Sequence, residues 1–470
     1  MVSRQDLSVT VRWLLFVIAA AIPAVTHITA QSSYFVSSKD QTFQLNNKPY
    51  YFIGTNYWYG SLLGLEKDKK RGVERLRKEL DFLQRNGVMN LRLMAGAEGS
   101  GMINGVMRVG PPLQPERGKF DESVLDGLDL MLAEMGKRRM KAVIFFSNNW
   151  EWSGGFQQYV DWNGLIPDEL KGRKLNWDEL RDMVGRFYVC AECKRDYLKH
   201  VQFVLDRTNK INGRKYTDDP TIMAWELANE PRPMWPALRE RYVEWVREAA
   251  AAIKERDKKH LVTIGHEGSI GTESMEVFEE IHRDANIDYL TIHIWAKNWG
   301  WFSEGKLAAD FPSVVQKATA YIDEHVAVAR RLNKPLVIEE FGLPRNEVVT
   351  RRGEGETRGR GDQENRRKGE QEDGLFQNLK SKIQNLEPGS PSTLRDEYFR
   401  KIFSYVGKGS VAGANFWAFG GTARPVKGQV FWKAGDEWMG DPPMEEQGLN
   451  SVFDSDTSTW RVIRAAARGK

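Results

Sequence analysis

Two glutamates stand where short apolar runs of the sequence end. Glu230, which Asn229 precedes, follows the run Ile222–Trp225, and Glu340 follows the run Leu336–Ile338. Short apolar runs are typical of buried strands, and packing does not explain a carboxylate at the end of each. Two carboxyl groups that face one cleft can divide the work of proton donor and nucleophile. The sequence therefore predicts a catalytic pair, provided that the fold brings the two glutamates together.

Other polar and aromatic side chains also end or follow apolar runs. They supply indole, guanidinium, amide, carboxylate and imidazole groups, from Trp58, Arg92, Asn149, Arg232, Glu267, His293, Trp295 and Trp417. Hydroxyl groups need both donors and acceptors, and a pyranose ring needs a flat apolar partner. The combination favours a neutral polyol as the ligand.

Composition and motifs exclude several other classes of protein. The net charge of +4 is small for 470 residues and no basic stripe interleaved with aromatics is present, so nucleic acid is not an expected partner. No phosphate-binding glycine loop follows a strand, and no H-E-x-x-H or EF-hand motif occurs, so we expect neither a cofactor nor a metal. The only cysteines, Cys190 and Cys193, predict a local disulfide or two unpaired structural thiols.

The elements that must position these groups alternate along the chain. The apolar runs predict eight strands, at 51–54, 88–93, 142–146, 222–227, 261–264, 289–293, 336–339 and 413–417. Amphipathic patterns between them predict helices at 73–86, 122–136, 194–209, 238–256, 314–332 and 394–405. Eight such repeats predict an α/β fold, a closed (β/α)8 barrel whose active site lies at the carboxyl ends of the strands.

Three segments fall outside the barrel pattern. Residues 1–30 are predicted to be a secretory signal peptide, because Arg4 and Arg12 precede an apolar run too short to span a membrane. An uncleaved anchor is the alternative. A short β-hairpin with Asn46-Asn47 at its turn is expected to close the far end of the barrel. Residues 349–392 are rich in Arg, Glu, Gly and Gln and predict a disordered charged insertion within a catalytic domain of 31–470.

Longer motifs resemble one enzyme family. The segment G-R-K-Y-T-D-D-P-T-I-M-A-W-E-L-A-N-E-P-R at 213–232 is similar to that of endo-β-1,4-mannanases of glycoside hydrolase family 5, as are V-I-E-E-F-G, T-I-H-I-W and A-N-F-W. The resemblance covers most of residues 40–465 apart from the charged insertion. It implies a retaining enzyme in which Glu230 is the acid/base and Glu340 the nucleophile.

The resemblance also implies roles for the neighbouring side chains. Asn229 would hold the 2-hydroxyl of the sugar that is cleaved, and Trp417 would lie beneath that sugar. Arg92 and His293 would orient the carboxylates, while Arg232 and Glu267 would contact sugars on the leaving-group side. Trp295 departs from many relatives, which have a Tyr that hydrogen-bonds the nucleophile. Either the Trp295 indole replaces that donor, or Arg92 and His293 suffice.

Two further glutamates adjoin the predicted pair. Successive side chains of a strand face opposite ways, so only one of Glu339 and Glu340 can point into the cleft, and the Glu-Phe-Gly position favours Glu340. Glu226 lies within a strand and is expected to be a buried, hydrogen-bonded barrel residue. Arg92 near the nucleophile is expected to lower the pKa of that carboxyl.

The sequence thus predicts a secreted, monomeric endo-β-1,4-mannanase that hydrolyses internal bonds of mannan, glucomannan or galactomannan, with β-mannan as its partner and no membrane contact after signal removal. An extracellular location is expected, and a periplasmic one is open. Another family 5 specificity, such as a cellulase or an exo-β-mannosidase, is the first alternative. A non-catalytic mannan-binding barrel is the second.

Overall fold

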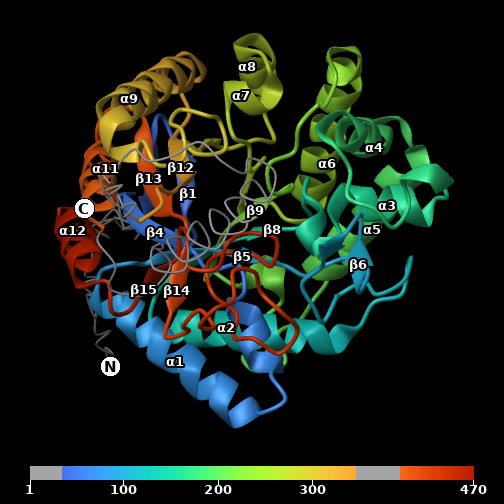
Figure 1. Ribbon diagram of the computed structural model, residues 1–470, viewed down its shortest axis with the longest axis horizontal. Coiled ribbons are helices and arrows are strands. Elements are labelled where there is room, and N and C mark those ends of the chain that lie inside the picture. Colours follow the sequence, from blue (N-terminus) through green and yellow to red (C-terminus); the bar gives the residue numbers. More distant parts are fainter. Residues whose placement is uncertain (1–33, 346–391, 470) are drawn as a thin grey trace, which may run out of the picture. The chain divides into compact units, whose positions relative to one another are not determined.

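Eight parallel strands form a central barrel in the computed structural model, which describes residues 34–345 and 392–469. The strands lie at the centre of the molecule in Figure 1. The strands are β4 (Phe52–Asn56), β5 (Asn90–Met94), β8 (Lys141–Phe145), β9 (Ile222–Glu226), β10 (Leu261–Thr263), β11 (Leu290–Ile294), β12 (Leu336–Phe341) and β13 (Val411–Phe416). They pair in chain order from β4 to β10, and β4 also pairs with β13, which continues through β12 to β11. Each overlaps a predicted strand.

The barrel closes between β10 and β11. The amide of Asp288 donates to the carbonyl of Val262 over 2.8 Å, and the amide of His293 donates to the carbonyl of Glu267 over 3.1 Å. These bonds join the two ends of the sheet, so the predicted closed (β/α)8 barrel is confirmed. All eight strands are buried throughout, as expected for a parallel sheet that helices cover from outside.

Helices surround the strands in Figure 1 and follow the predicted order. The predicted ones appear as α1 (Lys69–Arg85), α2 (Glu122–Lys137), α5 (Ala191–Leu205), α6 (Arg239–Arg256), α9 (Leu307–Leu332) and α11 (Thr393–Phe403). The sequence patterns missed α3 (Gly155–Trp162), α4 (Trp177–Val189), α7 (Ser269–Thr272), α8 (Met275–Arg283) and α12 (Thr457–Arg468). Two of these, α3 and α4, lengthen the connection between β8 and β9 and so stand beside the carboxyl ends of those strands.

The predicted hairpin closes the amino-terminal end of the barrel. Strands β2 (Thr42–Leu45) and β3 (Lys48–Tyr50) pair antiparallel, and β1 (Ser37–Lys39) adds a third strand. Asn46 and Asn47 at the turn have φ of 53° and 61°, the left-handed pair that a two-residue hairpin turn needs. Phe43 packs in one apolar cluster with Met223 and Val337, which come from barrel strands.

Further short elements occur outside the barrel. They are β6 (Met102–Ile103), β7 (Val106–Met107), β14 (Phe419–Gly421), β15 (Val452–Phe453) and the 3-10 turns η1 (Gly60–Leu65), η2 (Glu151–Ser153), η3 (Asp168–Leu170), η4 (Tyr216–Asp218) and η5 (Pro236–Leu238). A long irregular connection between β14 and β15 carries residues 422–451.

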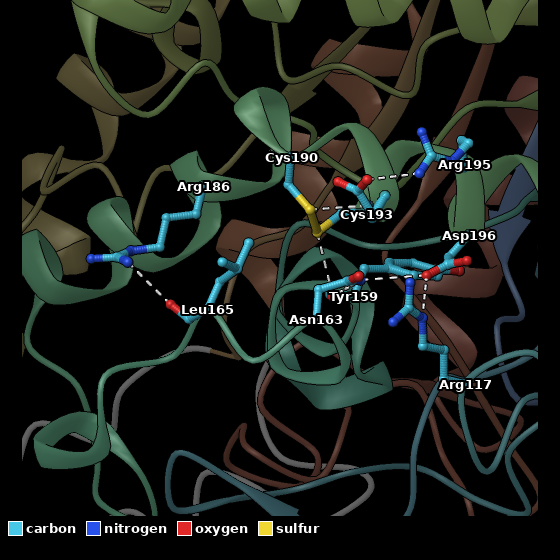
Figure 2. The surroundings of a disulfide bond; sticks show 10 residues. Arg117, Tyr159, Asn163, Leu165, Arg186, Cys190, Cys193, Arg195 and Asp196 are labelled. Carbon is cyan, nitrogen blue, oxygen red and sulfur yellow. Dashed lines mark hydrogen bonds and ion pairs between the residues drawn. A yellow bond between two sulfur atoms is a disulfide. The ribbon is translucent and has the colours of Figure 1, made fainter.

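Cys190 and Cys193 form a disulfide at the junction of α4 and α5, which selects the first of the two predicted states. Figure 2 shows the bridge at the start of α5, where the Cys190 sulfur also caps the helix by accepting the Cys193 amide over 3.0 Å. One turn further on, Asp196 pairs with Arg117 over 2.6 Å. The bridge therefore closes the corner between α4 and α5.

Two predictions concern residues beyond this description. The signal peptide at 1–30 lies outside the described residues, and so does the charged insertion at 349–392 apart from Ser392. Among the residues that are described, no helix combines the length and the apolar character that crossing a membrane requires.

Candidate active site

Glu230 lies just beyond β9, on a segment that hydrogen bonds hold against the end of β10. Its amide donates to the carbonyl of Gly265 over 2.9 Å, and the amide of Leu227 donates to that of Thr263 over 3.0 Å. Glu230 has a φ of 53°, a left-handed conformation that costs a non-glycine residue roughly 1–3 kcal/mol. The backbone turns sharply there, which aims the carboxyl into the mouth of the barrel.

Glu340 lies near the end of β12, and an irregularity in strand register decides which neighbour faces the cleft. Ile292 of β11 pairs with Ile338, but the next residue, His293, pairs with Glu340, so Glu339 is skipped in the ladder. Glu340 lines the cavity, whereas Glu339 is fully buried below it. The preference for Glu340 over Glu339 agrees with this placement.

The two carboxyl groups approach each other closely. One oxygen of Glu230, one of Glu340 and a ring nitrogen of His293 all lie within 4.8 Å of one another. Inverting glycosidases hold their carboxyl groups roughly 6.5–9.5 Å apart to admit a water, and retaining ones about 5–5.5 Å apart. Oxygens that lie within 4.8 Å of each other favour the shorter of these two separations.

Two side chains bridge the pair. His293 Nδ1 lies 2.7 Å from Glu230 Oε1 and 3.3 Å from Glu340 Oε2. The indole nitrogen of Trp295, whose single N–H can donate, lies 3.2 Å from Glu230 Oε1 and 3.2 Å from Glu340 Oε2. Burial lowers the pKa of His293 to about 4, so the imidazole is neutral at pH 7. The Trp295 indole donates to Glu340, as the tyrosine of many relatives is expected to do. Of the two explanations that the sequence left open, the structure therefore favours replacement of the tyrosine by Trp295.

Arg92 anchors the site from beneath. Its guanidinium contacts the Glu340 carboxylate, pairs with Glu226 at 2.5 Å and 2.8 Å, and donates to Asn229 Oδ1 over 2.7 Å. Arg92 is completely buried and is not in the cavity wall. It holds Glu340 and Asn229, which line the cavity, without reaching the cavity itself. Glu226 is the buried, hydrogen-bonded barrel residue that its position in the strand predicts.

Burial governs the electrostatics of the pair. It raises the pKa of Glu340 well above the usual range, and Arg92 acts in the opposite direction without reversing the shift. Burial likewise raises the pKa of Glu230. The expectation that Arg92 lowers the pKa of the nucleophile thus has the right sign for Arg92 alone, but desolvation outweighs it. Arg92 contacts Glu340 directly, whereas Glu230 accepts from the indole N–H groups of Trp150 and Trp295.

The cavity above the pair has a volume of about 360 Å³. Its wall contains seven of the eleven predicted site residues, namely Asn229, Glu230, Arg232, Glu267, Trp295, Glu340 and Trp417. Arg232 and Glu267 form a two-bond fork at 2.5 Å and 2.6 Å, which holds both side chains in place. Trp417 meets Trp295 edge to face, with ring centroids 5.7 Å apart. These seven aromatic, charged and amide side chains thus line one cavity.

Besides Arg92 and His293, two predicted residues lie outside the wall. Trp58 is 1 % exposed, because its indole N–H donates to the carbonyl of Gly440 over 2.7 Å and the 422–451 connection covers it. Asn149 is fully buried and accepts from the Arg232 amide over 3.3 Å. The structure therefore gives Trp58 and Asn149 supporting contacts where the sequence predicts substrate contacts.

The cavity wall contains further residues to which the sequence assigned no substrate contact. Trp150, two residues beyond Asn148 in the N-N-W motif, donates its indole N–H to Glu230 Oε2 over 2.5 Å. The wall also contains Trp152, Trp177, Ile270, Asn298, Trp299, Pro442, Met444 and Glu445. Trp150 is one of the residues that follow the predicted strands, at the same end as the other residues of the rim. The last three come from the irregular 422–451 connection, which has no periodicity to read.

Three residues of the site could offer oxygen and nitrogen ligands to a cation. Within residues 34–345 and 392–469, the possible ligand atoms of Glu230, His293 and Glu340 lie close enough together to hold a metal ion. Arg92 already contacts Glu340, and a fixed guanidinium charge beside that oxygen opposes a cation there. The charge arrangement thus suits a neutral substrate better.

The chain is similar to known proteins along nearly its whole length. A family model described as glycoside hydrolase family 5 beta-mannosidase-like matches residues 33–469. Mannan endo-1,4-beta-mannosidase 7 of Arabidopsis thaliana is 32% identical over 66% of this chain and 68% of that protein. Mannan endo-1,4-beta-mannosidase 4 of Solanum lycopersicum is 26% identical over 91% of this chain and 90% of that protein.

A solved structure gives the same result in three dimensions. The crystal structure of a glycoside hydrolase family 5 mannosidase from Rhizomucor miehei is 31% identical, with a TM-score of 0.75 over 93% of this chain and 98% of the other.

Proposed function

The chain belongs to glycoside hydrolase family 5, and on that premise we propose that it is an endo-β-1,4-mannanase acting on mannan, glucomannan or galactomannan with retention of configuration. The observation that carries the proposal is the Glu230–Glu340 pair, with oxygens within 4.8 Å of each other, beneath an aromatic rim. The relatives named as mannan endo-1,4-beta-mannosidases support the choice of substrate.

The reaction takes two steps. In the first, the Glu340 carboxylate attacks the anomeric carbon while Glu230 gives its proton to the glycosidic oxygen, which leaves with the bond electrons. In the second, Glu230 takes a proton from water, and that water displaces Glu340 from the sugar. Negative charge passes from Glu340 to Glu230 and back during the cycle. The Trp295 N–H lies at equal distances from both carboxyls and can bond whichever is charged.

The surrounding residues suit a mannosyl ring. Trp417 offers an apolar face, and Asn229 is held between Arg92 and Asn148 so that its amide is fixed beside the reacting sugar. Arg232 and Glu267 supply a charged fork for hydroxyls on the side of the acid. We propose these as the substrate contacts, with Trp58 and Asn149 acting through the loops that they hold.

We further propose that the enzyme acts outside the cell as a monomer after removal of residues 1–30. The basic residues Arg4 and Arg12 before a short apolar run support secretion, and the Cys190–Cys193 disulfide is compatible with an oxidising compartment. Mass spectrometry of the protein in the culture medium would test both the location and the cleavage site.

An exo-acting β-mannosidase is the second candidate. The Rhizomucor miehei structure, 31% identical with a TM-score of 0.75, is described as a mannosidase. In addition, Pro442, Met444 and Glu445 of the 422–451 connection stand in the cavity wall, where a wall of this kind could shorten an open cleft. The reaction products decide how many sugar units bind on the non-reducing side of the cleaved bond.

The products of mannohexaose and the viscosity of galactomannan test the proposal. An endo-mannanase gives a range of short oligomers and lowers viscosity early, whereas an exo-mannosidase releases mannose with little change in viscosity. Cellohexaose and carboxymethyl cellulose test for a cellulase. The proposal fails if wild-type protein and Glu340→Ala behave identically on every mannan substrate, and binding without turnover would favour the non-catalytic alternative.

A further inference from the structure

Glu98 is a fully buried carboxyl that lies behind the wall of the catalytic cavity. It stands four residues beyond the end of β5, the strand that carries Arg92. Its carboxyl accepts hydrogen bonds from uncharged donors, and burial raises its pKa to about 7. Burying an ionisable group costs free energy that an apolar side chain of similar volume would not cost. Packing alone therefore does not explain a glutamate at this position.

The two oxygens of Glu98 hold the two ends of one segment, residues 147–155. Oε1 accepts from the Ser147 hydroxyl over 2.7 Å, and Oε2 accepts from the Gly155 amide over 3.2 Å. The hydroxyl of Tyr159 in α3 also donates to Oε1, over 3.1 Å. One side chain thus joins the beginning of the segment to its end, and the ends cannot separate without breaking these bonds.

The segment also packs closely against the backbone of Glu98. The Glu98 amide donates to the carbonyl of Ser153 over 2.9 Å. Gly154 has a φ of 91°, and a Cβ atom at that position would collide with the Glu98 carbonyl oxygen. Within the segment, the Asn148 amide group donates to the Ser153 hydroxyl over 3.1 Å, and Asn148 Oδ1 accepts from the Trp150 amide over 3.0 Å. The position of Trp150 is therefore set by the bonds that hold the segment.

The segment reaches the proton donor at two points. Trp150 donates its indole N–H to Glu230 Oε2 over 2.5 Å. The amide of Asn229, which precedes Glu230, donates to the Ser147 carbonyl over 2.8 Å. Glu230 becomes charged as it gives up its proton, and a hydrogen bond to a charged oxygen is stronger than one to a neutral oxygen. The Trp150 bond therefore contributes most in the step that protonates the leaving group.

We propose that Glu98 is a positioning residue for acid catalysis, which holds residues 147–155 so that the Trp150 indole bonds Glu230 as that carboxyl loses its proton. This inference rests on the proposed function and adds to it a residue that neither lines the cavity nor touches the substrate. Glu98 acts through hydrogen-bond geometry, because its partners are two hydroxyls and an amide. A glutamine could make the same set of bonds, since each hydroxyl can also accept.

The test compares two substrates that differ in their need for a proton. The 2,4-dinitrophenolate group leaves without protonation, whereas phenolate needs the acid, so the ratio of kcat/KM on phenyl β-mannoside to that on 2,4-dinitrophenyl β-mannoside reports acid catalysis. The corresponding β-mannobiosides are used if the products of mannohexaose show endo attack. Effects that act equally on both substrates, such as a displaced Asn229, cancel in this ratio.

Five variants are compared with the wild type: Glu98→Leu, Glu98→Gln, Ser147→Ala, Trp150→Phe and the double variant Glu98→Leu/Trp150→Phe. Glu151→Gln is the matched control, because Glu151 is a buried carboxyl of the same segment that accepts from Gln157 over 3.3 Å. Thermal unfolding of each variant establishes that it is folded.

Glu98→Leu should lower the ratio by about tenfold, the scale of one hydrogen bond to a charged group, and Ser147→Ala should lower it by a smaller factor. Glu98→Gln should recover most of the ratio, and the Glu151→Gln control should keep the wild-type value. The double variant should lose no more than Trp150→Phe alone, because both substitutions remove the same bond to Glu230.

A wild-type ratio in folded Glu98→Leu overturns the inference, and so does a double variant whose loss is the product of the two single losses. If Glu98→Leu does not fold, a wild-type ratio in Ser147→Ala overturns it in the same way. A wild type that is inactive on every mannoside overturns the proposed function instead.

Discussion

The shared N–H of Trp295 leads to a quantitative prediction. Trp295→Phe removes a donor that lies 3.2 Å from an oxygen of both Glu230 and Glu340. A hydrogen bond to a charged group contributes roughly 1.5–3 kcal/mol, and 3.2 Å is at the long end of the range, so about 1.5 kcal/mol is the appropriate value. That free energy corresponds to about a tenfold loss in kcat/KM.

The loss should also move the pH profile in a defined direction. The N–H stabilises the charged form of each carboxyl, so its removal raises the pKa of both. About 1.5 kcal/mol corresponds to roughly one pKa unit, and shared between two groups it gives about half a unit each. The acidic limb reports ionisation of Glu340 and the basic limb reports loss of the proton from Glu230. Both limbs should therefore move to higher pH.

Trp295→Tyr is the matched variant, because it differs from Trp295→Phe by one hydroxyl that can donate. The assay is initial rate on mannopentaose from pH 3 to 9 for the three proteins, with thermal unfolding as a check on folding. We expect the tyrosine variant to be several-fold more active than the phenylalanine variant. Equal activity of the two variants, or limbs that move to lower pH in Trp295→Phe, would refute the reasoning that the shared N–H stabilises both carboxylates.

Three further perturbations test the surroundings of the pair. Glu340→Ala should cost several orders of magnitude in rate and, with azide added, should yield an α-mannosyl azide detectable by NMR, whereas Glu230→Ala should yield the β-azide; the opposite assignment would exchange their roles. Arg92→Met should destabilise the fold by roughly 3–5 kcal/mol in denaturant titration, because it leaves buried carboxylates unpaired; a change below about 1 kcal/mol would contradict the anchoring role. Reducing the Cys190–Cys193 bridge should cost roughly 2 kcal/mol for so short a loop, with a double serine variant giving the same loss, and no change in either would show that α4 is held by other contacts.

The sequence predicted the residues at the ends of the barrel strands better than the other residues of the cavity wall. Glu230 and Glu340 follow apolar strands, so the barrel geometry alone places them on one rim. Arg92 lies within a strand, so its side chain faces either the barrel interior, where the two glutamates are, or the surrounding helices. Trp177 and Glu445 stand on an inserted helix and an irregular connection, where neither periodicity nor spacing fixes direction. Trp58 follows its strand as the active residues do, but the 422–451 connection covers it, which only the tertiary structure reveals.

The electrostatic prediction failed in an instructive way. The sequence indicated Arg92 near the nucleophile and hence a lowered pKa for Glu340. The structure confirms the contact, yet burial raises the pKa of Glu340 well above the usual range, and the neighbouring carboxyl groups of Glu230, Glu226 and Glu339 raise it further. A single pair contact can be guessed from strand positions, whereas desolvation depends on everything that excludes water from the site.

The stereochemistry of the first product tests the central claim most directly. Hydrolysis of a β-mannooligosaccharide is followed by ¹H NMR at the anomeric signals, within the minutes before mutarotation. Two carboxyl groups this close predict that the β-anomer of the new reducing end appears first and the α-anomer only later. Initial appearance of the α-anomer would mean that a water attacks in place of Glu340, and would contradict the account of the active site given by its geometry.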